Sequence, residues 1–250
     1  MALSVALSTS VLAQAQPHAG RSVTEWLTRM HEASRQRAYT GTLVVSAGSA
    51  MSASKIWHVC DGTQQMERID SLTGTARTTL RKNDEVLTLV PESRVAWAEK
   101  RQALRPFPDQ IKTPGNAIEE HYTLRLQGVE RVAGFEADVL HIQPRDALRF
   151  GYRVWSEKQT GLTVKMQTLD GQGQVIEQMV FSELQLDAPV KMETLARQMA
   201  KTEGYKIVRP QLNKTSPEAQ GWRLRQEVPG FQGMSSHTRG DPAAAPGLLP

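Results

Sequence analysis

An alternation of apolar and polar residues organises the chain between residues 147 and 187 and predicts β-strands there. Three alternating runs are separated by Ser156 to Gly161 and by Asp170 to Gly173. A two-residue period places successive side chains on opposite faces of a sheet, and short connections of this kind favour antiparallel neighbours. The segment is therefore predicted to fold as a three-stranded antiparallel meander.

Shorter alternating runs before this meander predict more of the same sheet. The pairs Asp61-Gly62, Thr73-Gly74 and Asn83-Asp84 separate some of them as hairpin turns do. Because no crossover helix lies between the runs, antiparallel pairing is expected. The predicted fold class is mainly β (α+β), an open, curved antiparallel sheet or half-barrel. The additional strands are expected at residues 40–46, 53–59, 64–69, 76–82, 85–90, 94–99, 121–131 and 136–143.

A different period precedes the strands and predicts one amphipathic helix over residues 23–37. Ser22 and Glu25 have the spacing of a capping box, which satisfies backbone N–H groups at a helix start. Apolar residues then recur at helical spacing, with Trp26 as the largest. The helix is expected to cover or plug the open sheet, with Trp26 as its anchor.

The last hairpin of the meander is predicted to have one apolar face. Pairing of Leu169 with Gln174 across a tight turn would set its register. The expected cross-strand pairs are Leu162 with Phe181, Val164 with Met179, and Met166 with Glu177.

This apolar face, with aromatic residues of the preceding strand and two residues of the helix, is the candidate lining of a hydrophobic hollow. Methionine adapts to irregular ligands, so such a lining suits an acyl chain or an apolar peptide. An ordinary core closed by the Trp26 helix would use the same residues, and the pattern alone favours neither reading. The candidate ligand-binding residues are Trp26, Met30, Phe150, Tyr152, Leu162, Val164, Met166, Met179 and Phe181.

Other segments divide the chain into parts. Prolines between residues 100 and 119 predict a loop with one helical turn, and spaced apolar residues from Val190 to Met199 predict a short helix. The expected division is a signal peptide at 1–15, a β domain at 22–187, a helix and linker at 188–218, the start of a truncated C-terminal domain at 219–232, and a disordered tail at 233–250.

The first fifteen residues, MALSVALSTSVLAQA, support export from the cytoplasm. They form a short apolar run ending in Ala13 and Ala15, as a signal-peptidase site requires, although the usual basic start is missing. No later segment has the roughly 18 apolar residues of a membrane helix. The predicted protein is exported and does not span the membrane.

Charge and cysteine usage exclude several classes of partner and site. The net charge of +4 is spread along the chain without a basic run, so no nucleic acid partner is expected. Cys60 is the single cysteine, which excludes an internal disulfide and a paired-cysteine metal or redox motif. No two of the six histidines have metal-ligand spacing, and His58 and His141 are interpreted as sheet residues. With no catalytic motif found, no enzyme activity, metal or cofactor is predicted.

The most specific motif of the chain is FGYRVW at residues 150–155, followed by Thr160-Gly161-Leu162. Together with several shorter motifs, it resembles the RseB/MucB family of periplasmic regulators of the envelope-stress sigma factor. The resemblance covers residues 23–231. Its other parts are the helix followed by residues 39–45, His58 with Asp61-Gly62, Glu67-Arg68, residues 177–182, Gly221-Trp222 and Pro229-Gly230-Phe231.

This resemblance implies a fold, a location and a partner. The large domain would resemble the lipoprotein carrier LolA, an open sheet with plugging helices, located in the periplasm. Its partner would be the periplasmic domain of a membrane anti-sigma factor of the RseA/MucA type. Binding would protect that segment from proteolysis and repress the stress response until lipopolysaccharide or lipoprotein acyl chains cause release.

The shortened C-terminal domain departs from the family pattern. The alternative is a periplasmic lipid or lipoprotein carrier that uses the same hollow, and the resemblance leaves homo-oligomerisation open.

Overall fold

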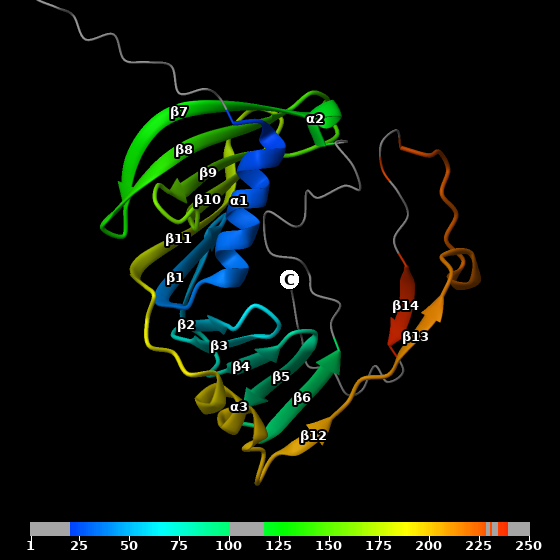
Figure 1. Ribbon diagram of the computed structural model, residues 1–250. Coiled ribbons are helices and arrows are strands. Elements are labelled where there is room, and N and C mark those ends of the chain that lie inside the picture. Colours follow the sequence, from blue (N-terminus) through cyan, green and yellow to red (C-terminus); the bar gives the residue numbers. More distant parts are fainter. Residues whose placement is uncertain (1–20, 101–117, 229–230, 232–234, 240–250) are drawn as a thin grey trace, which may run out of the picture.

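A computed structural model of the chain describes residues 21–100, 118–228, 231 and 235–239 (Figure 1). The predicted signal peptide and most of the predicted loop at 100–119 lie outside these residues. The helices are α1 (Val23–Gln36), α2 (Ile118–His121) and α3 (Met192–Ala200), and a 3-10 turn η2 spans Glu218–Gln220. The strands are β1 (Tyr39–Ala47), β2 (Ala50–Cys60), β3 (Gln65–Ser71), β4 (Thr78–Lys82), β5 (Glu85–Val90), β6 (Val95–Lys100), β7 (Tyr122–Val132), β8 (Phe135–Pro144), β9 (Gly151–Glu157), β10 (Thr163–Leu169), β11 (Val175–Leu186), β12 (Lys206–Val208), β13 (Leu212–Thr215) and β14 (Ser236–Arg239).

One twelve-stranded sheet forms the body of the protein. Its order is β12-β6-β5-β4-β3-β2-β1-β11-β10-β9-β8-β7, with β7 at one edge and β12 at the other. Among the described strands, β12 alone pairs in parallel with its neighbour, β6. The sheet is open and strongly curved (Figure 1). The predicted fold class, a mainly β protein with an open antiparallel sheet, is confirmed.

Helix α1 lies in the hollow of the curved sheet (Figure 1). The predicted capping box is present: Glu25 N–H donates to Ser22 Oγ at 3.1 Å, and Ser22 N–H donates to the Glu25 carboxylate at 2.7 Å. Trp26 is 5% exposed, which confirms it as a buried anchor. The apolar stripe of α1 therefore faces the concave side of the sheet.

Helix α3 packs on the outer side of the sheet. Its Leu195 contacts Val59 of β2 and Met66 of β3. Along β2, Ile56 and His58 face the hollow and alternate with Trp57 and Val59, so the latter two face outward. The two helices thus cover opposite faces of one sheet.

The predicted register of the β10–β11 hairpin is wrong by two residues. Met166 pairs with Met179 rather than with Glu177, and Leu169 pairs with Val175 after an irregularity at Thr168. A turn that begins at Asp170 accounts for the shift, because Asp170 both donates to Gln174 O and accepts from Gly173 N–H. A shift of two residues keeps each side chain on its face, so the predicted separation of the faces survives.

The segment predicted as a linker contains regular structure. Within residues 204–218 lie β12, which joins the large sheet, and β13, which pairs with β14 in a two-stranded sheet. Strand β14 occupies four residues of the predicted disordered tail, while residues 233–234 and 240–250 of that tail lie outside the described part of the chain.

Candidate binding surface in the hollow of the sheet

One end of the hollow is a packed apolar cluster between α1 and strands β7 to β10. Met30 of α1 and Leu140 of β8 are both fully buried. Tyr152 and Met166 are partly buried and pack against the cluster from β9 and β10. Burial raises the pKa of Tyr122, whose ring lies near Tyr152, to about 12. The remaining buried members are Val23, Trp26, Leu27, Ile118, Tyr122, Ile142 and Val154.

A second cluster continues the apolar surface beyond the middle of α1. It joins Ala33 of the helix to Leu162 and Phe181 of the sheet. The Phe181 ring lies directly against Gly41 of β1, because a Cβ atom at Gly41 would come within 2.8 Å of Phe181 Cδ1. Glycine at this position lets the aromatic ring approach the backbone of the neighbouring strand closely.

The structure brings most of the predicted lining residues to the hollow. Trp26, Met30, Tyr152 and Met166 belong to or pack on the first cluster, and Leu162 and Phe181 belong to the second. Met179 is half-buried opposite Met166. Because α1 covers these side chains, the apolar surface is packed core in this structure, and its use as a ligand surface stays a prediction.

Two predicted lining residues lie elsewhere. A bulge between Thr163 and Lys165 moves Val164 out of the alternation, and it packs with Trp155 and Val139, outside the α1 clusters. Phe150 precedes β9 and is 52% exposed. The prediction that these two side chains line the hollow is therefore wrong, since simple alternation accounts neither for a bulge nor for a strand that starts one residue later.

A polar group that the sequence reasoning missed lies beside the second apolar cluster. His58 is 2% exposed, stacks on Tyr39 with 4.9 Å between ring centroids, and donates from Nδ1 to Arg37 O at 2.9 Å. Burial lowers the pKa of His58 and raises that of Tyr39. Glu67, the cross-strand neighbour of His58, forms an ion pair with Arg81 of β4.

The interpretation of His58 as a sheet residue is confirmed. Its alternation with Ile56 was the signal that it faces the hollow.

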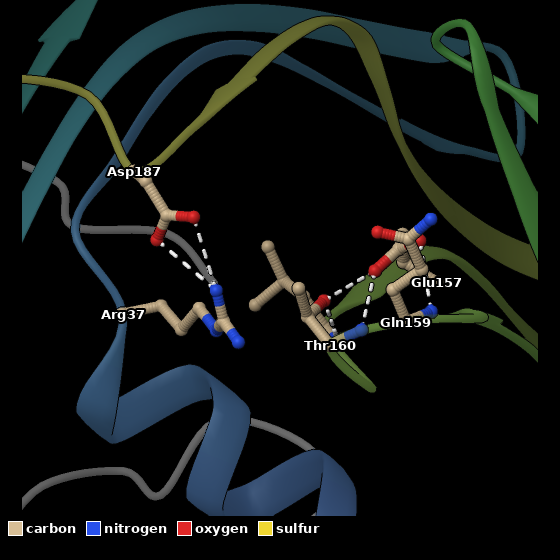
Figure 2. Close-up of polar contacts among 6 residues, drawn as sticks. Arg37, Glu157, Gln159, Thr160 and Asp187 are labelled. Atoms are coloured by element: carbon tan, nitrogen blue, oxygen red, sulfur yellow. Dashed lines mark hydrogen bonds and ion pairs between the residues drawn. The ribbon is translucent and has the colours of Figure 1, made fainter.

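The end of β9 and the Thr160-Gly161-Leu162 motif form the turn between β9 and β10 (Figure 2). Glu157 is 4% exposed, and its carboxylate accepts hydrogen bonds from Gln159 N–H at 3.0 Å, Thr160 N–H at 2.6 Å and Thr160 Oγ1 at 2.6 Å. Burial alone raises the pKa of Glu157, but these hydrogen bonds and the charge of Arg29 outweigh it, so the pKa lies below its ordinary value.

Helix α1 is fixed to this turn and to the end of β11. Arg29 donates to Lys158 O at 2.6 Å, and Gly161 has a φ of 89°, which a side chain would strain. Arg37, just past the helix, pairs with Asp187 at 3.0 Å (Figure 2). The Thr160-Gly161-Leu162 motif therefore has a structural role, because the turn that contains it helps to position α1 in the hollow.

Replacing Glu157 by glutamine should lower the free energy of unfolding by about 2 kcal/mol at pH 7, since the turn loses its charged acceptor. Because the pKa of Glu157 is lower in the folded than in the unfolded protein, this stabilisation is fully present at pH values above the unfolded-state pKa of about 4.3. It is lost as the pH falls through the lower pKa of the folded state. Urea unfolding of both proteins between pH 7 and pH 3 should show the difference shrinking.

Glu136→Gln is the matched control, because the Glu136 side chain is 72% exposed and pairs with Lys158 at 3.5 Å. It should cost less than about 0.5 kcal/mol. Equal losses for the two variants would show that the Glu157 turn does not stabilise the fold.

The described residues contain no group of His, Cys, Asp or Glu side chains that could hold a metal ion. No helix in the described ranges is long and apolar enough to cross a bilayer. The hollow offers apolar contact area with a buried polar margin at His58.

Comparison with known proteins identifies relatives. Residues 22–199 match the family described as MucB/RseB N-terminal domain. The chain is 29% identical to the sigma factor AlgU regulatory protein MucB of Pseudomonas aeruginosa over 229 residues, which cover 87% of this chain and 66% of MucB. It is 23% identical to the sigma-E factor regulatory protein RseB of Haemophilus influenzae over 186 residues, or 74% of this chain and 58% of RseB.

The solved complex of P. aeruginosa MucA and MucB contains a similar fold, with a TM-score of 0.56 and 28% identity over 69% of this chain and 59% of the matched chain. Across these matches the chain spans between 58 and 66% of its relatives' lengths. The relatives are regulatory proteins, which confirms the prediction that the protein is not an enzyme.

Proposed function

Because this chain belongs to the MucB/RseB family, we propose that it is a periplasmic regulator that binds the periplasmic segment of an anti-sigma factor. The observation that supports this most directly is the structure of MucB bound to the periplasmic part of MucA, at 29% identity over 69% of this chain. The apolar run at residues 1–15 supports export.

The output of binding is protection of the partner from proteolysis. A protease cuts a segment that is free to extend into its active site, so a protein that holds the segment lowers the cleavable fraction by mass action. At a free concentration tenfold above Kd, about one molecule in eleven stays free. No catalytic group is needed for this output.

Lipid signals would act through the hollow. The side chains that suit an acyl chain, such as Met166 and Phe181, belong to the clusters that α1 covers, and Met30 of α1 is fully buried against the sheet. An acyl chain entering the hollow would therefore replace contacts of α1. Movement of α1 would disturb Arg29 and Arg37, which fix it to the β9–β10 turn and to β11. This links lipid binding to a change of shape and hence to release of the partner.

The test is cleavage of an anti-sigma periplasmic segment in the presence of the full chain. At a protein concentration tenfold above Kd, the initial cleavage rate should fall about tenfold, and added lipopolysaccharide should restore it. An unrelated substrate of the same protease is the control and should be cut at an unchanged rate. Unchanged cleavage of the anti-sigma segment at every protein concentration would refute the proposed function.

A further inference from the structure

A second cleft lies outside the hollow, on the face of the sheet that α3 covers. It has a volume of about 470 Å³ and lies between α3, the connection that precedes α3, and strands β1, β2, β3 and β11. We call it the α3 cleft and define it by Trp57, Arg68, Lys191, Leu195 and Gln198. Its volume is within the range of small-molecule sites, about 300–1,000 Å³.

An aromatic surface forms part of the wall of the α3 cleft. Trp57 faces outward because its neighbours Ile56 and His58 face the hollow. The Arg68 guanidinium lies over the Trp57 ring, 5.4 Å from its centroid. Two nitrogens of Arg68 are held by the Asp70 carboxylate, at 2.8 to 3.1 Å, so the arginine is fixed in this position. A cation stacked on an aromatic ring is thus held in the wall of the cleft before any ligand arrives.

The charge of the α3 cleft is positive. Arg68 and Lys191 line it, and no acidic side chain is among the described residues of its wall. Asp70 balances Arg68, whereas Lys191 makes no ion pair within the described chain. Lys191 also precedes the first turn of α3, whose start has no side-chain cap.

We propose that the α3 cleft binds a small anionic ligand with an apolar body, such as an arylalkyl carboxylate. Trp57 and Leu195 would contact the apolar body, and Lys191 would pair with the carboxylate. The site is separate from the hollow and does not depend on the proposed function. Charge complementarity distinguishes this ligand from a neutral or cationic one of the same shape.

Titration of the full, ¹⁵N-labelled chain with 4-phenylbutyrate tests the site, with 4-phenylbutylamine as the ligand of opposite charge. The Trp57 indole signal, assigned by its loss in Trp57→Phe, should shift and saturate with the carboxylate. The amine should bind at least tenfold more weakly. The Trp26 indole signal should stay unchanged, because Trp26 belongs to α1 and is buried in the hollow, on the opposite face of the sheet from the cleft.

Lys191→Gln should weaken 4-phenylbutyrate binding about fivefold, because Lys191 is exposed and an ion pair at an exposed site contributes little more than this. Lys201→Gln, at the other end of α3 and outside the cleft wall, is the control and should leave binding unchanged. The proposal is overturned by absence of a Trp57 shift, by equal binding of the amine, or by equal affinities of the two lysine variants. Unshifted Trp26 and Trp155 signals in both variants establish that the fold is intact.

Discussion

Replacing Trp26 by alanine is expected to lower the free energy of unfolding by about 3–5 kcal/mol, the usual cost of removing a buried aromatic side chain. Trp26 is 5% exposed and belongs to the cluster that joins α1 to the sheet. The guanidinium carbons of Arg21 and Arg29 lie 4.8 and 5.7 Å from the centroid of its ring, so the substitution also removes two cation–π contacts. The measurement is urea unfolding followed by far-UV circular dichroism.

Trp222→Ala is the matched control, because Trp222 is 73% exposed. Its effect should be within about 0.5 kcal/mol of zero. A loss below about 1 kcal/mol for Trp26→Ala would mean that α1 is not anchored in the hollow through this side chain.

Replacing Gly41 by alanine should cost about 3 kcal/mol, at the upper end of ordinary overpacking effects. The new Cβ atom would lie 2.5 Å from Glu183 O and 2.8 Å from Phe181 Cδ1, closer than real Cβ contacts. The carbonyl belongs to the neighbouring strand β11, so relief requires movement of the backbone at the centre of the sheet. Thermal and urea unfolding should both detect the loss.

Gly171→Ala provides the comparison, since a Cβ atom there would meet nothing within 4 Å and Gly171 does not have a positive φ. It should be neutral or slightly stabilising, because alanine restricts the unfolded chain. If the two alanine variants unfold alike, the close contact between Gly41 and β11 does not exist in solution.

Local signals account for the parts of the fold that the sequence predicted well. The Ser22 and Glu25 pair and the helical spacing of Trp26 and Met30 depend on residues within four positions of one another, and α1 formed as expected. Strand positions also depend on local alternation and on turn residues such as Asn83, which has a φ of 53°.

The errors arose where structure depends on the pairing of distant segments. Nothing in the residues around Val164 shows the bulge that moves it toward Trp155. The contacts of the buried pair His58 and Glu67, which the sequence did not indicate, come from β1, from the loop before it and from β4. The α3 cleft likewise exists only because a helix near residue 195 returns to strands near residues 57 and 68. Such features require the tertiary arrangement.

Strand β12 also sets the practical boundary of a stable fragment. The family match ends at residue 199, yet residues 206–208 pair with β6. A fragment cut at the end of the family match would lack these residues and uncover the hydrogen-bonding groups of β6, next to the buried Trp97. Open strand edges of this kind recruit other chains, so the shorter fragment would favour aggregation. A fragment of the large sheet that is meant to stay monomeric has to extend past Val208.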